Sequence, residues 1–202
     1  MNQSLSFAGS ALLAGICIGI AGFGYLAIGG VVGAVTFAFG LLAVVHYRLK
    51  LYTGTAGFFV KGEFAKLCAI LALNIVGCLL VAMMARVSPM PLQQTAQHLL
   101  EGRLNAGWWQ CGVLAIGCGF IMTTAVKWGR EAKFLPLLFG VPLFIVCGFP
   151  HCVADAFYYL VVPAGFLADN ATQVLLLYAS IVAGNFVGCN LYRWILGNNE
   201  AA

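Results

Sequence analysis

Charged side chains are scarce in this sequence. Only 8% of its 202 residues are Asp, Glu, Lys or Arg, whereas soluble domains carry about 25%. Charge is wholly absent from residues 1–47, 67–85, 104–126, 134–154 and 170–192. Each of the last four windows has about the length of a membrane-spanning helix, and the first is long enough for two. The sequence therefore predicts an all-α integral membrane protein with six spans in a single domain, residues 1–202.

The sequence also lacks a basic segment before its first apolar stretch, so we expect that stretch to be a span and not a removed signal. Six spans place both termini on one side. Eight basic residues fall on the terminus side, and two, Arg86 and Arg103, fall opposite. The eight are Arg48, Lys50, Lys61, Lys66, Lys127, Arg130, Lys133 and Arg193. Since basic residues mark cytoplasmic loops, we expect an inner-membrane protein with cytoplasmic termini, and the net charge does not indicate nucleic-acid binding.

No cysteine lies in a predicted loop. All eight cysteines fall inside apolar windows, where a thiol acts as a small apolar side chain and no disulfide framework is expected. Cys147, His151 and Cys152 have donor types that suit a soft metal, but structural zinc takes four ligands and no fourth is evident. No nucleophile–base pair indicates a membrane enzyme either. The sequence thus predicts no metal, no cofactor and no enzymatic activity.

Two of the six predicted spans are broken. The spans are expected at 6–28, 30–60, 66–86, 106–127, 134–165 and 172–195. The second is interrupted by "HYRLKLYTGT" and the fifth by "CGFPHC", where Gly148 and Pro150 disfavour helix. Irregular backbone at membrane depth has to be shielded by protein or line a cavity. The paired breaks therefore predict a central site or pore.

The third and sixth spans carry an echoed motif. Asn74-Ile-Val-Gly77-Cys78 recurs as Asn185-Phe-Val-Gly188-Cys189, each after a broken span. Three spans per half give the halves, about 1–86 and 106–197, opposite topology, which is typical of channels and transporters. For Asn74 and Asn185 we favour interhelical hydrogen bonds, with the glycines allowing close packing; contact with a solute is the alternative.

Together these stretches resemble the formate/nitrite transporter family. "FAFGLLAVVHYRLKLYTGT" (37–55) is similar to that family's broken second helix, "FIVCGFPHCVADAF" (144–157) to its fifth helix, and "GNFVG" (184–188) to its sixth. The resemblance implies an aquaporin-like fold and a homopentamer with one pore per subunit. It also implies passage of small monovalent anions such as formate, nitrite, hydrosulfide, acetate or lactate, accompanied by protons, across the bilayer.

The resemblance also implies roles for individual residues. His151 is expected at the pore centre, hydrogen-bonded near Thr53. One constriction is expected from Leu41, Leu51 and Tyr52, and the other from Phe37 and Phe144. An apolar slot penalises a bare anion, and protonation removes most of that penalty. We therefore expect the anion to gain a proton in the pore, from His151 or through water, because imidazole titrates near neutrality.

Several positions depart from the family pattern. Lys50 stands where relatives often have an acid, Pro150 where they often have Glu, and Ile116-Gly117 where they carry an Asn. Arg103 is the substitute candidate for a lysine at the external funnel. Arg48, Lys50 and Arg103 are candidates to attract anions at the mouths, the first two equally well being ordinary membrane anchors.

Purely structural roles and another function are alternatives to these assignments. His151 could be a structural buried histidine, and Asp155 is interpreted as structural more than as a proton carrier. Trp108, Trp109 and Trp194 are expected in the interfacial aromatic belt. The alternative function is an aquaporin-like channel for neutral solutes, which should carry paired Asn-Pro-Ala turns; the sequence has none.

Overall fold

Helices form the whole architecture. The computed structural model describes residues 6–60 and 62–197, which contain ten α-helices and no strand. Lys61, one of the basic residues assigned to the terminus side, lies outside these residues. The helices are α1 (Phe7–Ile28), α2 (Gly30–His46), α3 (Tyr52–Ala56), α4 (Phe64–Arg86), α5 (Leu92–Ala106), α6 (Trp108–Arg130), α7 (Leu135–Val146), α8 (Cys152–Val161), α9 (Ala164–Asp169) and α10 (Ala171–Leu196).

Four of these helices, α1, α4, α6 and α10, are long and apolar enough to cross a membrane. The residues at their ends explain where these helices begin and end. Ser6 caps α1 by accepting a hydrogen bond from Gly9 N. Gly29 and Gly107 have φ of 70° and 87°, a conformation that glycine adopts without strain, and they separate α1 from α2 and α5 from α6.

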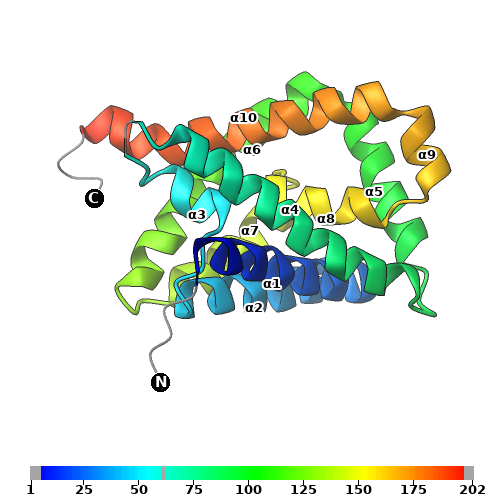
Figure 1. Cartoon of the computed structure of the whole chain (residues 1–202), viewed down its shortest axis with the longest axis horizontal. Helices are drawn as coiled ribbons and strands as arrows, with labels where there is room; N and C mark the ends of the chain where they lie inside the picture. The colour runs from blue at the N-terminus through cyan, green and yellow to red at the C-terminus, as the bar shows by residue number, and fades with distance from the viewer. Residues whose placement is uncertain (1–5, 61, 198–202) are drawn as a thin grey trace.

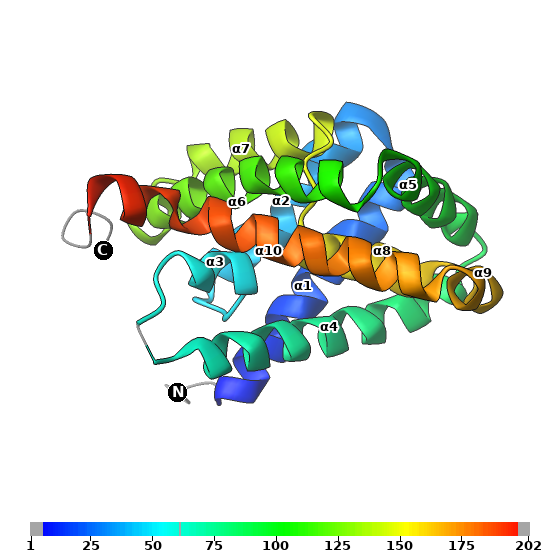
Figure 2. The same ribbon diagram turned by 90° about the horizontal axis from the view of Figure 1, so that it is seen from above.

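The long helices pack in two pairs. α1 lies against α4, and α6 lies along α10 (Figures 1 and 2). Glycines allow the close approach: a Cβ at Gly15 of α1 would collide with the Asn74 carbonyl of α4. A Cβ at Gly119 of α6 would likewise collide with the Asn185 carbonyl of α10. The short helices α3 and α8 lie between the pairs, in the middle of the molecule (Figure 1).

The two predicted interruptions are present. α2 ends at His46 and α3 begins at Tyr52, while α7 ends at Val146 and α8 begins at Cys152. The segment between α4 and α6 holds α5, which is 15 residues long and begins after Pro91. This helix contacts α8 and so closes one end of the central region.

Polarity is distributed as expected for a protein in lipid. Large apolar side chains are exposed along α2 and α7, among them Val31, Phe39 and Phe139. The buried polar side chains instead lie at the centre: Thr53, Asn74, Thr123, His151, Asp155, Asn185 and Asn190, with Ser10 near one end of α1. The function of the polar residues must therefore be sought inside the molecule.

Candidate pore centre

The two breaks have the same length and the same backbone conformation at matching positions. Each is five residues long, 47–51 and 147–151. The second residue of each is left-handed, with φ of 51° at Arg48 and 70° at Gly148. The last residue of each, Leu51 or His151, is extended and starts the next short helix. Glycine adopts the left-handed conformation freely, whereas Arg48 has to be held in it by its surroundings.

Asn74 binds the backbone of the first break. Its Oδ1 accepts from Tyr52 N at 2.9 Å, and its Nδ2 donates to Lys50 O at 3.0 Å and to Ala11 O at 2.7 Å. The Asn74 side chain on α4 thus provides hydrogen-bond partners for a carbonyl of α1 and for the free backbone groups where α3 begins. Buried backbone groups left without partners would be costly, so this amide permits the break.

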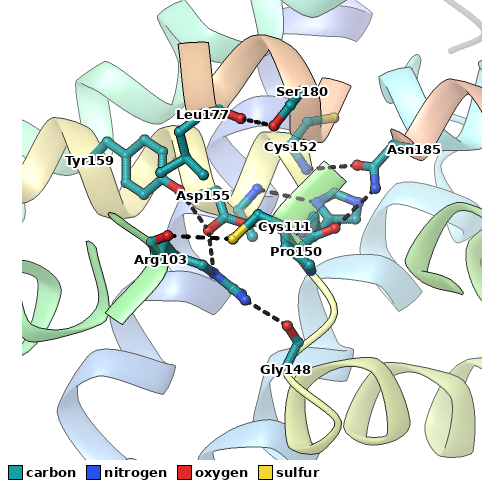
Figure 3. Close-up of polar contacts among 12 residues, drawn as sticks. Arg103, Cys111, Gly148, Pro150, Cys152, Asp155, Tyr159, Leu177, Ser180 and Asn185 are labelled. Carbon is teal, nitrogen blue, oxygen red and sulfur yellow. Dashed lines mark hydrogen bonds and ion pairs between the residues drawn. The ribbon is translucent and has the colours of Figure 1, made fainter. Parts of the chain in front are cut away.

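Asn185 repeats the arrangement at the second break. Its Oδ1 accepts from Cys152 N at 2.8 Å, and its Nδ2 donates to Pro150 O at 2.9 Å and to Ala115 O at 2.8 Å (Figure 3). The motif cysteines follow the same pattern. Cys78 Sγ lies 3.4 Å from the Val153 carbonyl oxygen, and Cys189 Sγ lies 3.4 Å from that of Thr53.

His151 lies where the two breaks meet. Its Nε2 is 2.9 Å from Thr53 Oγ1, and its Nδ1 accepts from Ala154 N at 3.2 Å, which caps α8. Because Nδ1 accepts, the neutral ring carries its proton on Nε2 and donates it to Thr53. His151 is 1% exposed and Thr53 is fully buried. The structure thus brings together a residue from each broken span.

The phenylalanines assigned to one constriction also lie together. The Phe144 ring stacks on the His151 ring with centroids 5.7 Å apart, and Phe37 meets Phe144 edge-on at 6.2 Å. Leu41 and Leu51 are both fully buried. Tyr52 is buried as well, and its hydroxyl approaches the Val182 carbonyl of α10 at 3.5 Å. Apolar side chains therefore surround the imidazole.

Arg103 is engaged inside the protein. Its Nη1 donates to Gly148 O at 2.5 Å, and its Nε lies 3.4 Å from Asp155 Oδ1, with its side chain 18% exposed (Figure 3). Asp155 Oδ2 accepts from His151 N at 2.9 Å, and Tyr159 Oη donates to Asp155 Oδ1 at 3.3 Å. The carboxylate therefore compensates the guanidinium, and the pair fixes both ends of the second break.

At the other end of the molecule, Arg48 and Arg130 line a cavity of about 390 Å³ beside the first break. Arg130 Nη2 donates to Gly54 O at 2.8 Å, and its guanidinium lies over the Phe58 ring. Lys50 turns elsewhere: its ammonium lies 5.6 Å from the centre of the Phe7 ring, and its backbone N donates to Ser10.

The sequence alone does not reveal two partners of the short helices α3 and α8. Arg130 was noted only as a marker of orientation. The sequence also indicates only an orientation role for Arg86, yet Arg86 donates to Leu160 O and Val162 O where α8 ends. Its position at the end of a span was the only signal. Within residues 6–60 and 62–197, no three His, Cys, Asp or Glu side chains are grouped so as to hold a metal.

The fold and the centre define a multi-pass membrane protein of the channel and transporter class. Residues 2–199 match the model of the formate/nitrite transporter family. The chain belongs to that family, which confirms the resemblance of its motifs.

Solved structures agree on the fold. One described as "Pentameric formate channel with formate bound" has a TM-score of 0.78 and 20% identity over 94% of each chain. An "FNT family ion channel" has a TM-score of 0.74 and 20% identity, over 95% of this chain and 88% of the other. A curated relative from Bacillus subtilis (strain 168), "Uncharacterized transporter YrhG", is 26% identical over 187 residues. That alignment covers 83% of this chain and 65% of the relative's length.

Proposed function

We propose that this protein conducts small monovalent anions through a pore in each subunit of a homopentamer in the cell's inner membrane. One observation carries the proposal: His151, the last residue of the second break, hydrogen-bonds Thr53 of α3, just after the first break, at 2.9 Å in an apolar centre. Membership of the family supports the class of substrate, and the pentameric neighbour supports the assembly. Formate, nitrite, hydrosulfide and short monocarboxylates are the candidate anions.

The proposed architecture has six crossings in two inverted halves, about 1–86 and 106–197. α2 with α3 forms one crossing, and α7 with α8 forms another, beside the four long helices. The matched hydrogen bonds of Asn74 and Asn185 support the repeat. Transporters with inverted halves and paired broken helices bind substrate at the interface of the halves, which supports a substrate site at the junction of the breaks, beside His151.

The surroundings of His151 suit a substrate that crosses in neutral form. Phe37 and Phe144 lie on one side and, in the proposed pore, Leu41, Leu51 and Tyr52 form the constriction on the other. These side chains exclude water and penalise a bare charge. A protonated formate or nitrite loses that penalty and still accepts and donates hydrogen bonds. All five side chains are buried in this conformation, so passage requires some of them to move.

Thr53 connects the imidazole to the substrate in this proposal. The neutral ring donates from Nε2 to Thr53 Oγ1, so the threonine hydroxyl can donate in turn to an anion. Neutral imidazole is itself a very weak acid. Transfer of a proton therefore requires His151 first to gain a second proton at Nδ1, which breaks the bond from Ala154 N. Lower pH should then favour flux.

Charges at the proposed mouths differ in what they can contribute. Arg48 and Arg130 line the cavity beside the first break and are placed to concentrate anions there. Arg103 is paired with Asp155, so we assign it mainly to holding the second break. Lys50 lies over an aromatic ring and acts as an anchor at the terminus side, which we take to be cytoplasmic.

The test is flux into liposomes that contain the purified protein. Formate, nitrite, hydrosulfide, acetate and lactate are compared at two pH values, with water and glycerol as neutral solutes. We expect flux of at least one of the anions, faster at the lower pH, and no glycerol flux. Passage of water or glycerol without any anion flux would instead support a neutral-solute channel.

A further inference from the structure

The cavity beside the first break carries two positive charges. Its volume is about 390 Å³, and α2, the first break, α3 and α6 all contribute to its lining. Arg48 and Arg130 are its charged residues, and none of the described residues that line it is acidic. The other lining residues are apolar or glycine: Val44, Val45, Leu49, Gly54 and Val126. The cavity therefore combines two guanidinium groups with an apolar wall.

Neither guanidinium is paired with an acid in the described part of the chain. The ion pairs within residues 6–60 and 62–197 involve other cations. Glu131 follows Arg130 directly, but its carboxylate lies 2.8 Å from the Lys133 ammonium. Arg130 donates one N–H group to Gly54 O, and its guanidinium lies 4.3 Å from the centre of the Phe58 ring. These contacts orient the guanidinium and leave its other N–H groups for a ligand.

The second break shows how the protein compensates an arginine where it supplies its own anion. There Asp155 Oδ1 lies 3.4 Å from Arg103 Nε. Asp155 is the fourth residue after the second break, and the fourth residue after the first break is Thr55. The Thr55 hydroxyl donates to Leu51 O at 2.8 Å. The first break thus has arginines beside it and no carboxylate at the matching position, which leaves room for an anion from solution.

Arg48 occupies a strained backbone position. Its φ is 51°, whereas the matching position of the second break is Gly148, with φ of 70°. This left-handed conformation strains an arginine and not a glycine, and such strain gathers at ligand sites. The Arg48 side chain lines the cavity and forms no hydrogen bond or ion pair within the described residues. An arginine kept at this position without a partner in the chain indicates a partner outside it.

We propose that this cavity, the Arg48–Arg130 site, binds the dianionic phosphate of a soluble phosphomonoester. Guanidinium groups hold phosphate oxygens through paired N–H bonds, and two permanent positive charges suit a dianion better than a monovalent anion. The volume of the cavity is in the range of small-molecule sites, and its apolar wall accommodates the organic part of the ester. A membrane phospholipid matches less well, because its phosphodiester carries a single charge.

A ligand in this site also blocks the pore, an effect that rests on the proposed function. Gly54 lines the cavity and directly follows Thr53 in the chain. A Cβ at Gly54 would lie 3.7 Å from Leu51 Cβ, so the cavity borders the proposed constriction. A dianion with an organic group is larger and more strongly charged than the proposed anions. It therefore stops at the constriction and closes the way for them.

The binding is tested by isothermal titration calorimetry of the purified full-length protein, with phenyl phosphate at a pH of about 8, where a phosphomonoester is a dianion. Benzoate, a monovalent anion, should bind at least about tenfold more weakly. Arg48→Gly should weaken the binding of phenyl phosphate about tenfold. This variant should fold, because glycine takes the same conformation at Gly148. Lys66→Gln is the matched control, since Lys66 is paired with Glu63 outside the cavity. Equal affinity in the wild type and Arg48→Gly would overturn the site.

The source of the phosphate is tested by competition in the same titration. Inorganic phosphate should displace phenyl phosphate only weakly, because it lacks the organic group, and a short-chain phosphatidylglycerol should not displace it. Equal affinity for inorganic phosphate would overturn the assignment to an ester. Displacement by phosphatidylglycerol at the same concentration would overturn the assignment to a soluble ligand.

The block is tested by formate flux in liposomes, with phenyl phosphate on both faces so that the orientation of the protein does not matter. The measured quantity is the ratio of flux with phenyl phosphate to flux without it. This ratio should be low in the wild type and Lys66→Gln and close to one in Arg48→Gly. Binding that leaves the wild-type ratio at one would overturn the block. Absence of anion flux in the untreated wild type would contradict the proposed function and the block with it, while calorimetry still decides the site.

Discussion

Asn74 and Asn185 hold the two broken helices by the same hydrogen bonds. Each accepts from the first amide of the short helix, at Tyr52 or Cys152, and each donates to the carbonyl two residues earlier. Each also donates to a neighbouring long helix. We call these two matching sets of hydrogen bonds, one at each break, the asparagine clamps. They fix the positions of Thr53 and His151.

Replacing either asparagine by alanine should destabilise the protein by similar amounts. Asn185→Ala leaves three buried backbone groups without partners, and Asn74→Ala leaves two buried groups and one partly buried group, which costs at least about 2 kcal/mol. The midpoint of thermal denaturation in detergent should fall by about 4–8 °C. Asn105→Ala, at an exposed position, should leave it unchanged. Unaltered stability with altered flux would instead indicate that the asparagines contact the solute.

The glycines at the helix crossings should not tolerate a methyl group. Gly15→Ala and Gly119→Ala each place a Cβ against the backbone of the partner helix, so the helices have to separate and the clamps above them shift. We expect a loss of stability of about 1–3 kcal/mol. Gly24→Ala in the same α1 helix meets nothing within 4 Å. It should be neutral, and equal effects at Gly15 and Gly24 would contradict the packing argument.

The ion pair of Arg103 and Asp155 should behave as one unit. Removing one partner leaves the other charge uncompensated in a largely buried site, and such changes cost about 3–5 kcal/mol when burial is complete. We therefore expect Arg103→Gln and Asp155→Asn each to destabilise strongly, and the double variant to be more stable than either. Thermal denaturation of the four proteins measures this coupling. Additive losses would show that the charges act independently.

Removing the Phe37 ring should widen the proposed aromatic constriction and so change which of the proposed anions pass. Phe37 is fully buried and meets Phe144 edge-on. Phe37→Ala should therefore raise the flux of lactate relative to formate, with a loss of stability of about 3–5 kcal/mol for the cavity. Phe39→Ala, on the exposed side of the same helix, should leave the lactate-to-formate ratio at the wild-type value. If Phe37→Ala also leaves it there, Phe37 does not form the constriction.

Much of the fold follows from periodic absence of charge and from helix breakers. The charge-free windows located the four long helices, and Gly148 with Pro150 marked the second break. The first break is harder to predict from the sequence, because Arg48 takes the left-handed conformation that glycine takes at the second break. The basic residues around Lys50 and the resemblance of residues 37–55 to the family's broken second helix indicated it.

The partners within the site were beyond the sequence. The motif predicted hydrogen bonds for Asn74 and Asn185, yet not that their partners are the broken helices. Arg103 was an expected mouth residue, and its ion pair with Asp155 joins residues 52 positions apart through the packing of α5 on α8. Such pairs depend on tertiary distances, which spacing along the chain does not encode.

The central claim is that His151 couples proton and anion in the pore, and formate flux in liposomes against pH tests it most directly. His151→Asn is the decisive variant, because asparagine can still cap α8 at Ala154 N but has no titratable proton to transfer. Thr53→Val removes the hydroxyl that contacts His151 and that we propose links the ring to the substrate. We predict that both variants fold, that both lose most of the flux, and that His151→Asn also loses its rise at low pH. Wild-type flux with wild-type pH dependence in His151→Asn would contradict the account.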